Sequence, residues 1–455
     1  MYQCESNIAE NFDNFYAMYC KIKEYGEKIA FIDGDMKKTY NDLSKDISKL
    51  VGAFDFKDKF ILIKTASKYF FAVSYFATVL SQNIACLQDS NEIFKAYEGF
   101  DIHFIADDSS VTELLSESAE TTVTSDIKHK MTTILCSSGT TFRPKAIALS
   151  SENLLTDLYF GMYNHSFKPN ARYVSILPYF HAFGLLADLF VPLSTGSTIY
   201  CTYNMFDFLT ALPQFDPTAL NLTPGAVNLL LTRLQYTNDK TKVVGKSLKS
   251  ILSGGAETPA DLAQQMRFFE ISVYGCYGLT ECSPCVAISG EQGYKDGSSG
   301  KIIGCNRISL DRETGVITVS GSNVMLGYLD KHGNLCSISE RNFVTNDIGY
   351  IDEDGFLYVL GRKDELMVLS DGTKRFPQEI EKKINSICGV CESLVYQEAD
   401  NICALIVVEK NADIKVISSS VANQNYDGIK LHKIQTTVEP LKKTNLGKII
   451  RKKNG

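Results

Sequence analysis

The chain has 455 residues, which is too long for one ordinary domain, because most domains hold about 150 residues. It is 44% hydrophobic and 22% charged, a composition that excludes disordered and fibrous proteins and predicts two to four domains or subdomains. Lysine and arginine (46) are outnumbered by aspartate and glutamate (53), so the net charge is −7. No net positive field attracts phosphate backbones, which excludes a protein whose main task is to hold nucleic acid.

The N-terminus has no basic start followed by an apolar run, so the sequence predicts no secretory signal. The most apolar stretch, residues 70–80, is interrupted by Ser74 and Thr78 and is too short to span a bilayer. We therefore expect a cytoplasmic protein without a membrane span. The sequence does not determine the oligomeric state.

Strand-like runs alternate with helical ones through most of the chain. Each predicted strand precedes a predicted helix: residues 59–63 precede 70–80, and residues 173–177 precede 183–193. Residues 248–252 precede a further helix, which we expect Thr258 to cap with Pro259 in its first turn. This alternation predicts an α/β fold in which helices cover sheets.

The pattern changes after about residue 300. Short strands at 317–319 and 349–351, a hairpin turn at 352–355 and a strand at 356–360 predict a β-rich subdomain over about 300–363. The polar residues 361–364 are the predicted domain boundary. Beyond them the sequence predicts a helix over 377–387 and strands over 394–397 and 403–409. We expect a large N-terminal domain over 1–363 and a small α+β C-terminal domain over 364–455.

The cysteines do not form the pattern of a disulfide scaffold, because there are 13 of them, an odd number, in 455 residues. Two C-x-x-C pairs occur, at Cys282 and Cys285 and at Cys388 and Cys391. A shared zinc site would have to bring them together across about a hundred residues, whereas structural zinc pairs usually lie closer. Reduced, mostly buried thiols are the expectation.

The strongest chemical signal is the segment 136–145, which follows the apolar run 131–135. A hydroxyl-rich turn with a glycine and a lysine offers backbone N–H groups, O–H donors and a positive charge to a polyphosphate. The segment lacks the spacing of a Walker A loop. By itself it is also compatible with a polar surface turn.

The segment 136–145 resembles the phosphate-binding loop of the adenylate-forming superfamily. This superfamily contains acyl-CoA synthetases, adenylation domains of peptide synthetases, and luciferases. Four further segments match in the family's order: 274–281, 345–347, 361–364 and 443–448. The resemblance covers nearly the whole chain and is nearest to the AMP-forming acyl-CoA synthetases. It implies the two-domain architecture above, with a mobile C-terminal domain.

The resemblance implies a nucleotide site. The residues that it assigns to ATP phosphates are Ser137, Ser138, Gly139, Thr140, Thr141 and Lys145. Those assigned to the adenosine part are Gly255, Ala256, Glu257, Tyr277, Asp347 and Arg362, with Tyr277 stacking on adenine and Asp347 accepting from both ribose hydroxyls. Glu281 is the implied magnesium ligand, and the Thr280 hydroxyl would bond the α-phosphate.

Lys448 is the implied catalytic residue of the first step, because an ammonium group can bridge the attacking carboxylate and the α-phosphate while charge builds there. Asp364 matches the family's hinge position. Lys448 has five basic neighbours, which we expect to form a solvated end or to meet the phosphates of coenzyme A or an acidic carrier protein: Lys442, Lys443, Arg451, Lys452 and Lys453.

The segment 177–185 resembles the acid-binding segment of acyl-CoA synthetases, and Gly254 and Gly278 are further pocket residues by the same resemblance. Relatives that activate amino acids place an aspartate at the position of His181. A buried ammonium group without a counter-charge is costly, so His181 argues against α-amino acids. His181 lines or gates the acyl tunnel, or is an ordinary packing residue.

Three positions depart from the family pattern. Phe142 and Ala146 stand where glycine is usual, and Ser151 replaces a common histidine. Phenylalanine does not readily adopt a positive φ, so the phosphate loop must be shaped differently if that conformation is needed at position 142. These departures are the support for a second hypothesis, a non-catalytic protein that binds ATP or an acyl-adenylate.

The leading hypothesis is a ligase that uses ATP and Mg²⁺. It would join a small carboxylic acid, fatty or aromatic and without an α-amino group, to a thiol. The thiol is coenzyme A or, as the alternative, the phosphopantetheine of an acyl or peptidyl carrier protein. Nothing in the sequence specifically supports the oxygen chemistry of luciferases.

Overall fold

The computed structural model describes residues 14–90, 97–124, 131–137, 144–165, 168–291, 293–338, 340–369, 372–443 and 449–451. The chain divides into two compact units. Unit 1 comprises Met1–Ile308, Val319–Phe343 and Ile351–Tyr358, and unit 2 comprises Ser309–Thr318, Val344–Tyr350 and Val359–Gly455. The domain boundary at residue 364 stays a prediction. Among the described residues, no helix is long and apolar enough to cross a membrane.

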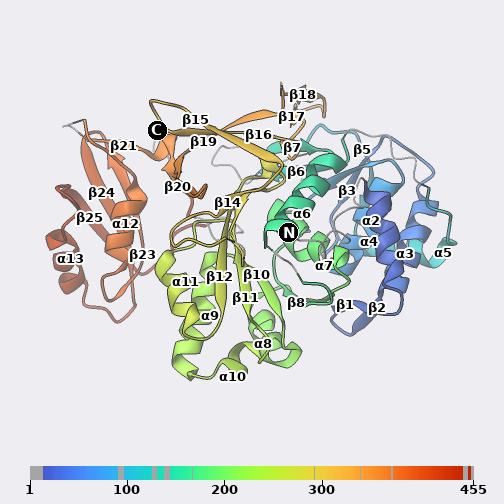
Figure 1. Cartoon of the computed structure of the whole chain (residues 1–455), viewed down its shortest axis with the longest axis horizontal. Helices are drawn as coiled ribbons and strands as arrows, with labels where there is room; N and C mark the ends of the chain where they lie inside the picture. The colour runs from blue at the N-terminus through green and yellow to red at the C-terminus, as the bar shows by residue number, and fades with distance from the viewer. Residues whose placement is uncertain are drawn as a thin grey trace. The chain divides into compact units, whose positions relative to one another are not determined.

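The larger sheet of unit 1 is parallel in its centre and antiparallel at both ends (Figure 1). Its described strands lie in the order β14 (Lys301–Ile302), β13 (Cys285–Ile288), β12 (Ser272–Gly278), β11 (Ser250–Ser253), β10 (Ala219–Leu222), β8 (Arg172–Ser175), β9 (Thr198–Cys201), β1 (Ile29–Asp33) and β2 (Met36–Thr39). Strands buried on both faces read as short apolar runs, as β13 does with Cys-Val-Ala-Ile.

A second sheet of unit 1 holds the strands that flank the predicted phosphate loop. Its described strands lie in the order β18 (Leu335–Ser337), β17 (Gly327–Leu329), β7 (Lys145–Leu149), β6 (Thr133–Ser137), β4 (Ile84–Leu87), β3 (Phe60–Ile63) and β5 (Ile102–Ala106). The β17 strand comes from a distant part of the chain and pairs antiparallel with β7.

Unit 1 also contains α-helices. They are α2 (Phe15–Glu24), α3 (Tyr40–Ala53), α4 (Lys68–Leu80), α5 (Asp108–Glu117), α6 (Ser151–His165), α7 (Val191–Ser194), α8 (Met205–Phe215), α9 (Pro224–Thr237), α10 (Lys240–Val244) and α11 (Ala260–Arg267). The α4 helix is buried on nearly all sides, which explains its apolar sequence. Its Tyr75 and Phe76 pack against Phe15 of α2 and Phe190 in one aromatic cluster.

A third sheet has the order β15 (Asn306–Leu310), β16 (Val316–Gly321), β19 (Asn342–Ile351) and β20 (Leu357–Arg362). The expected hairpin turn at 352–355 is present, because the Asp352 carboxylate accepts from the backbone N–H groups of Asp354 and Phe356. The two expected short strands are parts of the longer β16 and β19.

Unit 2 contains a sheet in the order β23 (Val390–Glu398), β24 (Asn401–Val408) and β25 (Leu431–Thr437), and a strand pair β21 (Met367–Val368) and β22 (Lys374–Arg375). Its helices are α12 (Pro377–Asn385) and α13 (Ile414–Asn423) (Figure 1). Apolar residues such as Ile384, Ile406 and Val421 form one core. The predicted α/β fold class is confirmed.

The structure confirms one local prediction and corrects another. The helix expected over 183–193 is present, as a π-helix, η1 (Gly184–Phe190), followed by α7, and a Cβ atom at Gly184 would lie 2.1 Å from the carbonyl oxygen of Pro178. Thr258 does not cap the next helix: Pro259 is the N-cap residue, and the Thr258 hydroxyl donates instead to Ser253 Oγ at 2.8 Å. In each case the contact is with a residue five or six positions earlier in the chain.

Candidate active site

Predicted site residues of unit 1 emerge from one edge of the larger sheet. The β11 and β12 strands are parallel neighbours, with Ser253 opposite Gly275. The segments 254–257 and 279–281 therefore follow strand ends on the same side. Ligands of open α/β sheets bind at such carboxyl ends.

Two of the predicted glycines leave no room for a side chain, Gly278 against neighbouring backbone and Gly254 against neighbouring side chains. A Cβ atom at Gly278 would lie 1.6 Å from the carbonyl oxygen of Pro284, and one at Gly254 would lie 2.6 Å from Cys276 Sγ and 3.0 Å from Cζ of Phe183. Gly255 has a φ of +82°, a conformation that side chains other than glycine rarely adopt. The structure thus brings Gly254 beside the predicted acid-binding segment.

Glu281 lies in a short 3₁₀ helix, η2 (Thr280–Cys282), directly after β12. Its carboxylate Oε1 accepts a hydrogen bond from the Tyr328 hydroxyl at 2.9 Å. Its backbone carbonyl accepts from the N–H of Met325, also at 2.9 Å. The predicted metal ligand is therefore held by side chain and backbone from the segment that leads into β17.

The phosphate loop is closed at its base by antiparallel pairing of Ser137 in β6 with Lys145 in β7. Lys145 Nζ lies 4.9 Å from the centroid of the Tyr328 ring. Of the other phosphate-binding predictions, Ser138, Gly139, Thr140 and Thr141 lie outside the described residues, as does Phe142. Lys145 and Glu281, two predicted site residues, thus contact the same tyrosine.

The other two departures from the family pattern occupy ordinary positions. Ala146 is buried in β7, where it is paired with Cys136 on one side and Leu329 on the other. Ser151 is the first residue of α6, directly after Ser150, whose hydroxyl accepts from the backbone N–H of Asn153 at 3.1 Å. Neither position requires glycine or histidine for the fold.

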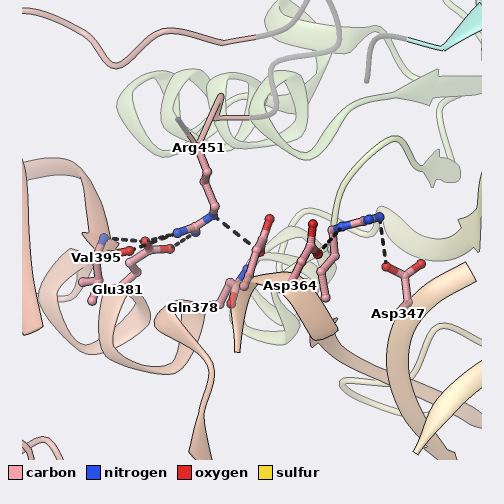
Figure 2. Close-up of polar contacts among 8 residues, drawn as sticks. Asp347, Asp364, Gln378, Glu381, Val395 and Arg451 are labelled. Carbon is pink, nitrogen blue, oxygen red and sulfur yellow. Dashed lines mark hydrogen bonds and ion pairs between the residues drawn. The ribbon is translucent and has the colours of Figure 1, made fainter. Parts of the chain in front are cut away.

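In unit 2 the predicted ribose residues lie together. Arg362 Nη1 lies 3.6 Å from Asp347 Oδ1, and Arg362 Nε donates to Asp364 Oδ1 at 3.0 Å (Figure 2). The backbone N–H of Asp347 donates to Thr345 Oγ1 at 3.0 Å within β19, where Asn346 between them has a φ of +66°. The arginine thus joins the predicted ribose acceptor to the predicted hinge residue.

His181 is largely buried, and burial lowers its pKa to about 4, while the nearby Asp89 carboxylate acts in the opposite direction. Among the described residues, its Nε2 atom has no hydrogen-bond partner. The imidazole is therefore neutral at pH 7. A buried polar atom without a partner suits a position that faces a ligand.

A buried polar network lies next to this segment. Lys68 Nζ donates to Ser175 Oγ at 2.8 Å, and Ser175 Oγ donates to Asp188 Oδ2 at 2.9 Å. The same carboxylate oxygen accepts from the backbone N–H of Leu177 at 3.1 Å. Burial lowers the pKa of Lys68, and the Asp188 carboxylate opposes that shift. The network fixes the start of the segment that carries His181.

The sequence suggested a solvated basic end as one possibility. In the structure, two of the basic side chains are instead paired with carboxylates. Arg451 is 17% exposed and forms a bidentate pair with Glu381, with Nη1–Oε1 and Nη2–Oε2 distances of 2.9 and 2.5 Å (Figure 2). Lys443 Nζ lies 2.5 Å from Glu392 Oε2. Both basic side chains are engaged within unit 2, whereas Lys448, Lys452 and Lys453 lie outside the described residues.

Comparison with known proteins identifies the family. Residues 59–329, more than half of the chain, match the family model described as AMP-binding enzyme. The chain belongs to the AMP-binding enzyme family. Membership confirms the resemblance found in the sequence and joins the phosphate loop, β12 and Glu281 in one family domain.

Relatives in this AMP-binding family include the 2-succinylbenzoate–CoA ligase of Bacillus pumilus (strain SAFR-032). It is 32% identical over 266 residues, 56% of this chain and 53% of that ligase. This chain thus spans about half the length of the curated relatives it matches. The O-succinylbenzoate coenzyme A synthetase of Bacillus subtilis, solved with AMP, has a TM-score of 0.80 at 23% identity and covers 96% of this chain and 97% of that chain. The structure of the same synthetase with ATP and magnesium ion has a TM-score of 0.80 at 23% identity. The match covers 95% of this chain and 98% of that chain.

The donor set of this AMP-binding chain fits a magnesium ion that arrives with ATP. The described parts of both units hold no cluster of three or more His, Cys, Asp or Glu side chains that could cage a metal ion. Proteins commonly hold Mg²⁺ through one or two carboxylates together with substrate phosphates. Glu281 offers one carboxylate whose Oε1 is already oriented by Tyr328.

The sequence alone did not reveal Tyr328, Lys68 or Arg451 as site or anchoring residues. Tyr328 reaches Glu281 because β17 pairs with β7, far away in the sequence. No spacing rule predicts that pairing. A lysine at the start of an apolar helix was a signal for a buried charge, and Lys68 is one.

The structure predicts a pH effect on stability through His181. Its folded pKa of about 4 lies below its ordinary value of 6.5, so between these values the unfolded chain binds a proton that the folded chain does not. Stability therefore falls as the pH is lowered through this range. Between pH 7 and 5 we expect His181 to account for a loss of about 2 kcal/mol.

Urea unfolding of the native chain and of His181→Gln at both pH values measures this effect. The substituted chain should lose less stability on acidification than the native chain. Replacing the exposed His332 is the matched control. Equal pH slopes in the native chain and His181→Gln would contradict a neutral buried imidazole.

Proposed function

We propose that this chain is an AMP-forming ligase that joins a carboxylic acid to a thiol in two steps. In the first step, an acid oxygen attacks the α-phosphorus of ATP, the bond to pyrophosphate breaks, and an acyl-adenylate forms. In the second step, a thiolate sulfur attacks the acyl carbon and AMP leaves. The family and the architecture support this proposal.

One observation carries it. Lys145 at the end of the phosphate loop and Glu281 after β12 contact the same tyrosine, although β7 and β12 belong to different sheets of unit 1. A cation for phosphate oxygens and a carboxylate for a hard metal ion are the groups that ATP·Mg²⁺ requires. When bound, Mg²⁺ would neutralise charge on the phosphates.

The remaining residues take roles from the same proposal. Tyr277 stacks on adenine, and Thr280 donates to the α-phosphate. Asp347, oriented by Arg362, accepts from the two ribose hydroxyls. Lys448 stabilises charge during attack on the α-phosphorus. Asp364 is the proposed hinge between the two steps.

For the acid, we propose an aromatic carboxylate. Two observations support this choice: the names of the 2-succinylbenzoate–CoA ligases, and the apolar contacts at the predicted pocket, where Gly254 lies against Phe183 and Cys276. A neutral His181 disfavours an α-ammonium group, which would meet an imidazole instead of a carboxylate. For the thiol, we propose coenzyme A, again from the names of the relatives.

Pyrophosphate release tests the proposal. The full chain is incubated with ATP, Mg²⁺ and acids from four classes: aromatic, fatty, α-amino and short aliphatic. Products with coenzyme A or a phosphopantetheine-loaded carrier protein are then identified by mass spectrometry. Release with an aromatic acid and formation of its CoA thioester are expected. Silence with every class, while ATP still binds, would overturn the proposal.

The altered phosphate loop motivates the non-catalytic alternative, and Phe142→Gly separates the two. In an active ligase we expect this substitution to change the rate of pyrophosphate release less than threefold, because the native loop already works. A large gain in an otherwise silent chain would show a degenerate site instead. Phe60→Leu in β3, away from the loop in the chain, controls for loss of an aromatic side chain.

A further inference from the structure

Tyr328 stands between the two charged groups proposed to handle the nucleotide. Its hydroxyl donates to Glu281 Oε1 at 2.9 Å, and its ring centroid lies 4.9 Å from Lys145 Nζ. An ammonium group within about 6 Å of an aromatic ring is attracted to the face of that ring. One half-buried side chain thus contacts both the cation and the anion.

The backbone of Tyr328 is fixed by its sheet. It is paired with Ile147 in β7 and with Cys336 in β18. The preceding Gly327 admits no side chain, since a Cβ atom there would lie 2.1 Å from the carbonyl oxygen of Cys336. The ring therefore projects from a rigid element, which is the support that a precise site needs.

The backbone around Glu281 is fixed independently of the tyrosine. The buried side-chain amide of Asn323 donates to the carbonyl oxygens of Cys282 at 2.9 Å and Cys285 at 2.8 Å, and to Asp157 Oδ1 at 3.0 Å. Loss of the Tyr328 hydroxyl would therefore leave the loop in place. What it would release is the orientation of the Glu281 carboxylate.

A carboxylate has about four lone-pair sites. A hydrogen bond to one oxygen fixes the plane of the group and leaves other sites for a metal ion. A tyrosine hydroxyl ordinarily titrates at about pH 10, so at neutral pH it carries the proton that it donates to the Glu281 carboxylate. Such outer partners of metal ligands typically change metal affinity 10- to 100-fold when they are removed.

We propose that Tyr328 is a positioning residue for the magnesium–triphosphate group: its hydroxyl orients Glu281 toward the metal ion, and its ring holds Lys145 toward the phosphates. This inference rests on the proposed function for the identity of the nucleotide. It goes further by assigning two separable tasks to one side chain.

Calorimetry can measure the two tasks of Tyr328 separately. The full chain is titrated with the non-hydrolysable ATP analogue AMPCPP, once with Mg²⁺ and once without it, and no acid is added. Tyr328→Phe keeps the ring and loses the hydroxyl. We expect about tenfold weaker binding of the magnesium complex and unchanged binding of the metal-free analogue. Tyr328→Leu loses the ring as well, and we expect both affinities to fall.

Tyr25→Phe is the matched control, because the Tyr25 hydroxyl donates to the backbone carbonyl oxygen of Ser194 at 2.6 Å in a similarly half-buried setting. It should leave both affinities unchanged. Thermal unfolding of each variant reports whether the fold is kept, and a Tyr328→Phe melting temperature near that of the native chain is expected.

Equal losses with and without Mg²⁺ in Tyr328→Phe, or no loss at all, would overturn the inference. So would a native chain that binds neither form of the analogue, since Tyr328 would then have no nucleotide to position. A native chain that binds the analogue with the expected pattern, yet releases no pyrophosphate with any acid, would defeat the proposed function alone.

Discussion

Lys448→Ala should lower the rate of acyl-adenylate formation by a factor on the order of 100 to 1,000. The side chain is the proposed source of positive charge where the carboxylate attacks the α-phosphorus, and alanine removes that charge. The second step does not use this ammonium group in our proposal. Thioester formation from a synthetic acyl-adenylate should therefore keep most of its rate.

Quenched-flow measurement of acyl-adenylate and of thioester, made separately, distinguishes the two steps. Lys443→Ala is the matched control, since Lys443 lies near Lys448 in the sequence but is engaged with Glu392. It should reduce adenylate formation far less. If Lys448→Ala forms adenylate as fast as the native chain, the catalytic assignment is wrong.

The largest loss of stability should come from Arg451→Ala. The Arg451 and Glu381 side chains are 17% and 8% exposed, and Glu381 also accepts from the backbone N–H of Val395 at 2.7 Å. Removing the arginine leaves a buried carboxylate without its counter-charge. Breaking a buried ion pair in this way costs about 3–5 kcal/mol. Unfolding by urea, monitored through hydrogen exchange of the β23 amides, measures this loss in the free energy of unfolding of unit 2.

Arg341→Ala provides the comparison. Arg341 also forms a bidentate pair, with Glu152, but those side chains are 43% and 55% exposed. Solvent screens such pairs, and removing one partner typically costs at most about 1 kcal/mol. Equal costs for the two substitutions would contradict the importance of burial for Arg451.

Local patterns predicted much of the fold because they report which faces are buried. The apolar run before the phosphate loop became β6, and the strand-like run before the glycines at 254–255 became β11. Local rules failed where a neighbour competed. Thr258 fits a helix cap by its type, but its hydroxyl found Ser253 instead.

The candidate site also contains residues that short motifs predict and residues that only the fold reveals. Glu281, Asp347 and Arg362 could be predicted as site residues because their motifs are short and contiguous, and the structure places Asp347 and Arg362 together. The position of Lys448 relative to them stays a prediction. Tyr328 was not found, because its contacts with Lys145 and Glu281 arise from strand pairing between distant segments.

The sequence by itself determined the α/β class and the AMP-binding family, since both depend on residue order along short stretches. Only the tertiary structure decided which charges are buried and paired. Arg451 reads as one more basic residue at the end of the chain, yet it lies against Glu381. Whether a charged side chain is solvated or paired with a carboxylate depends on segments that folding brings together. The spacing of residues along the chain does not predict those contacts.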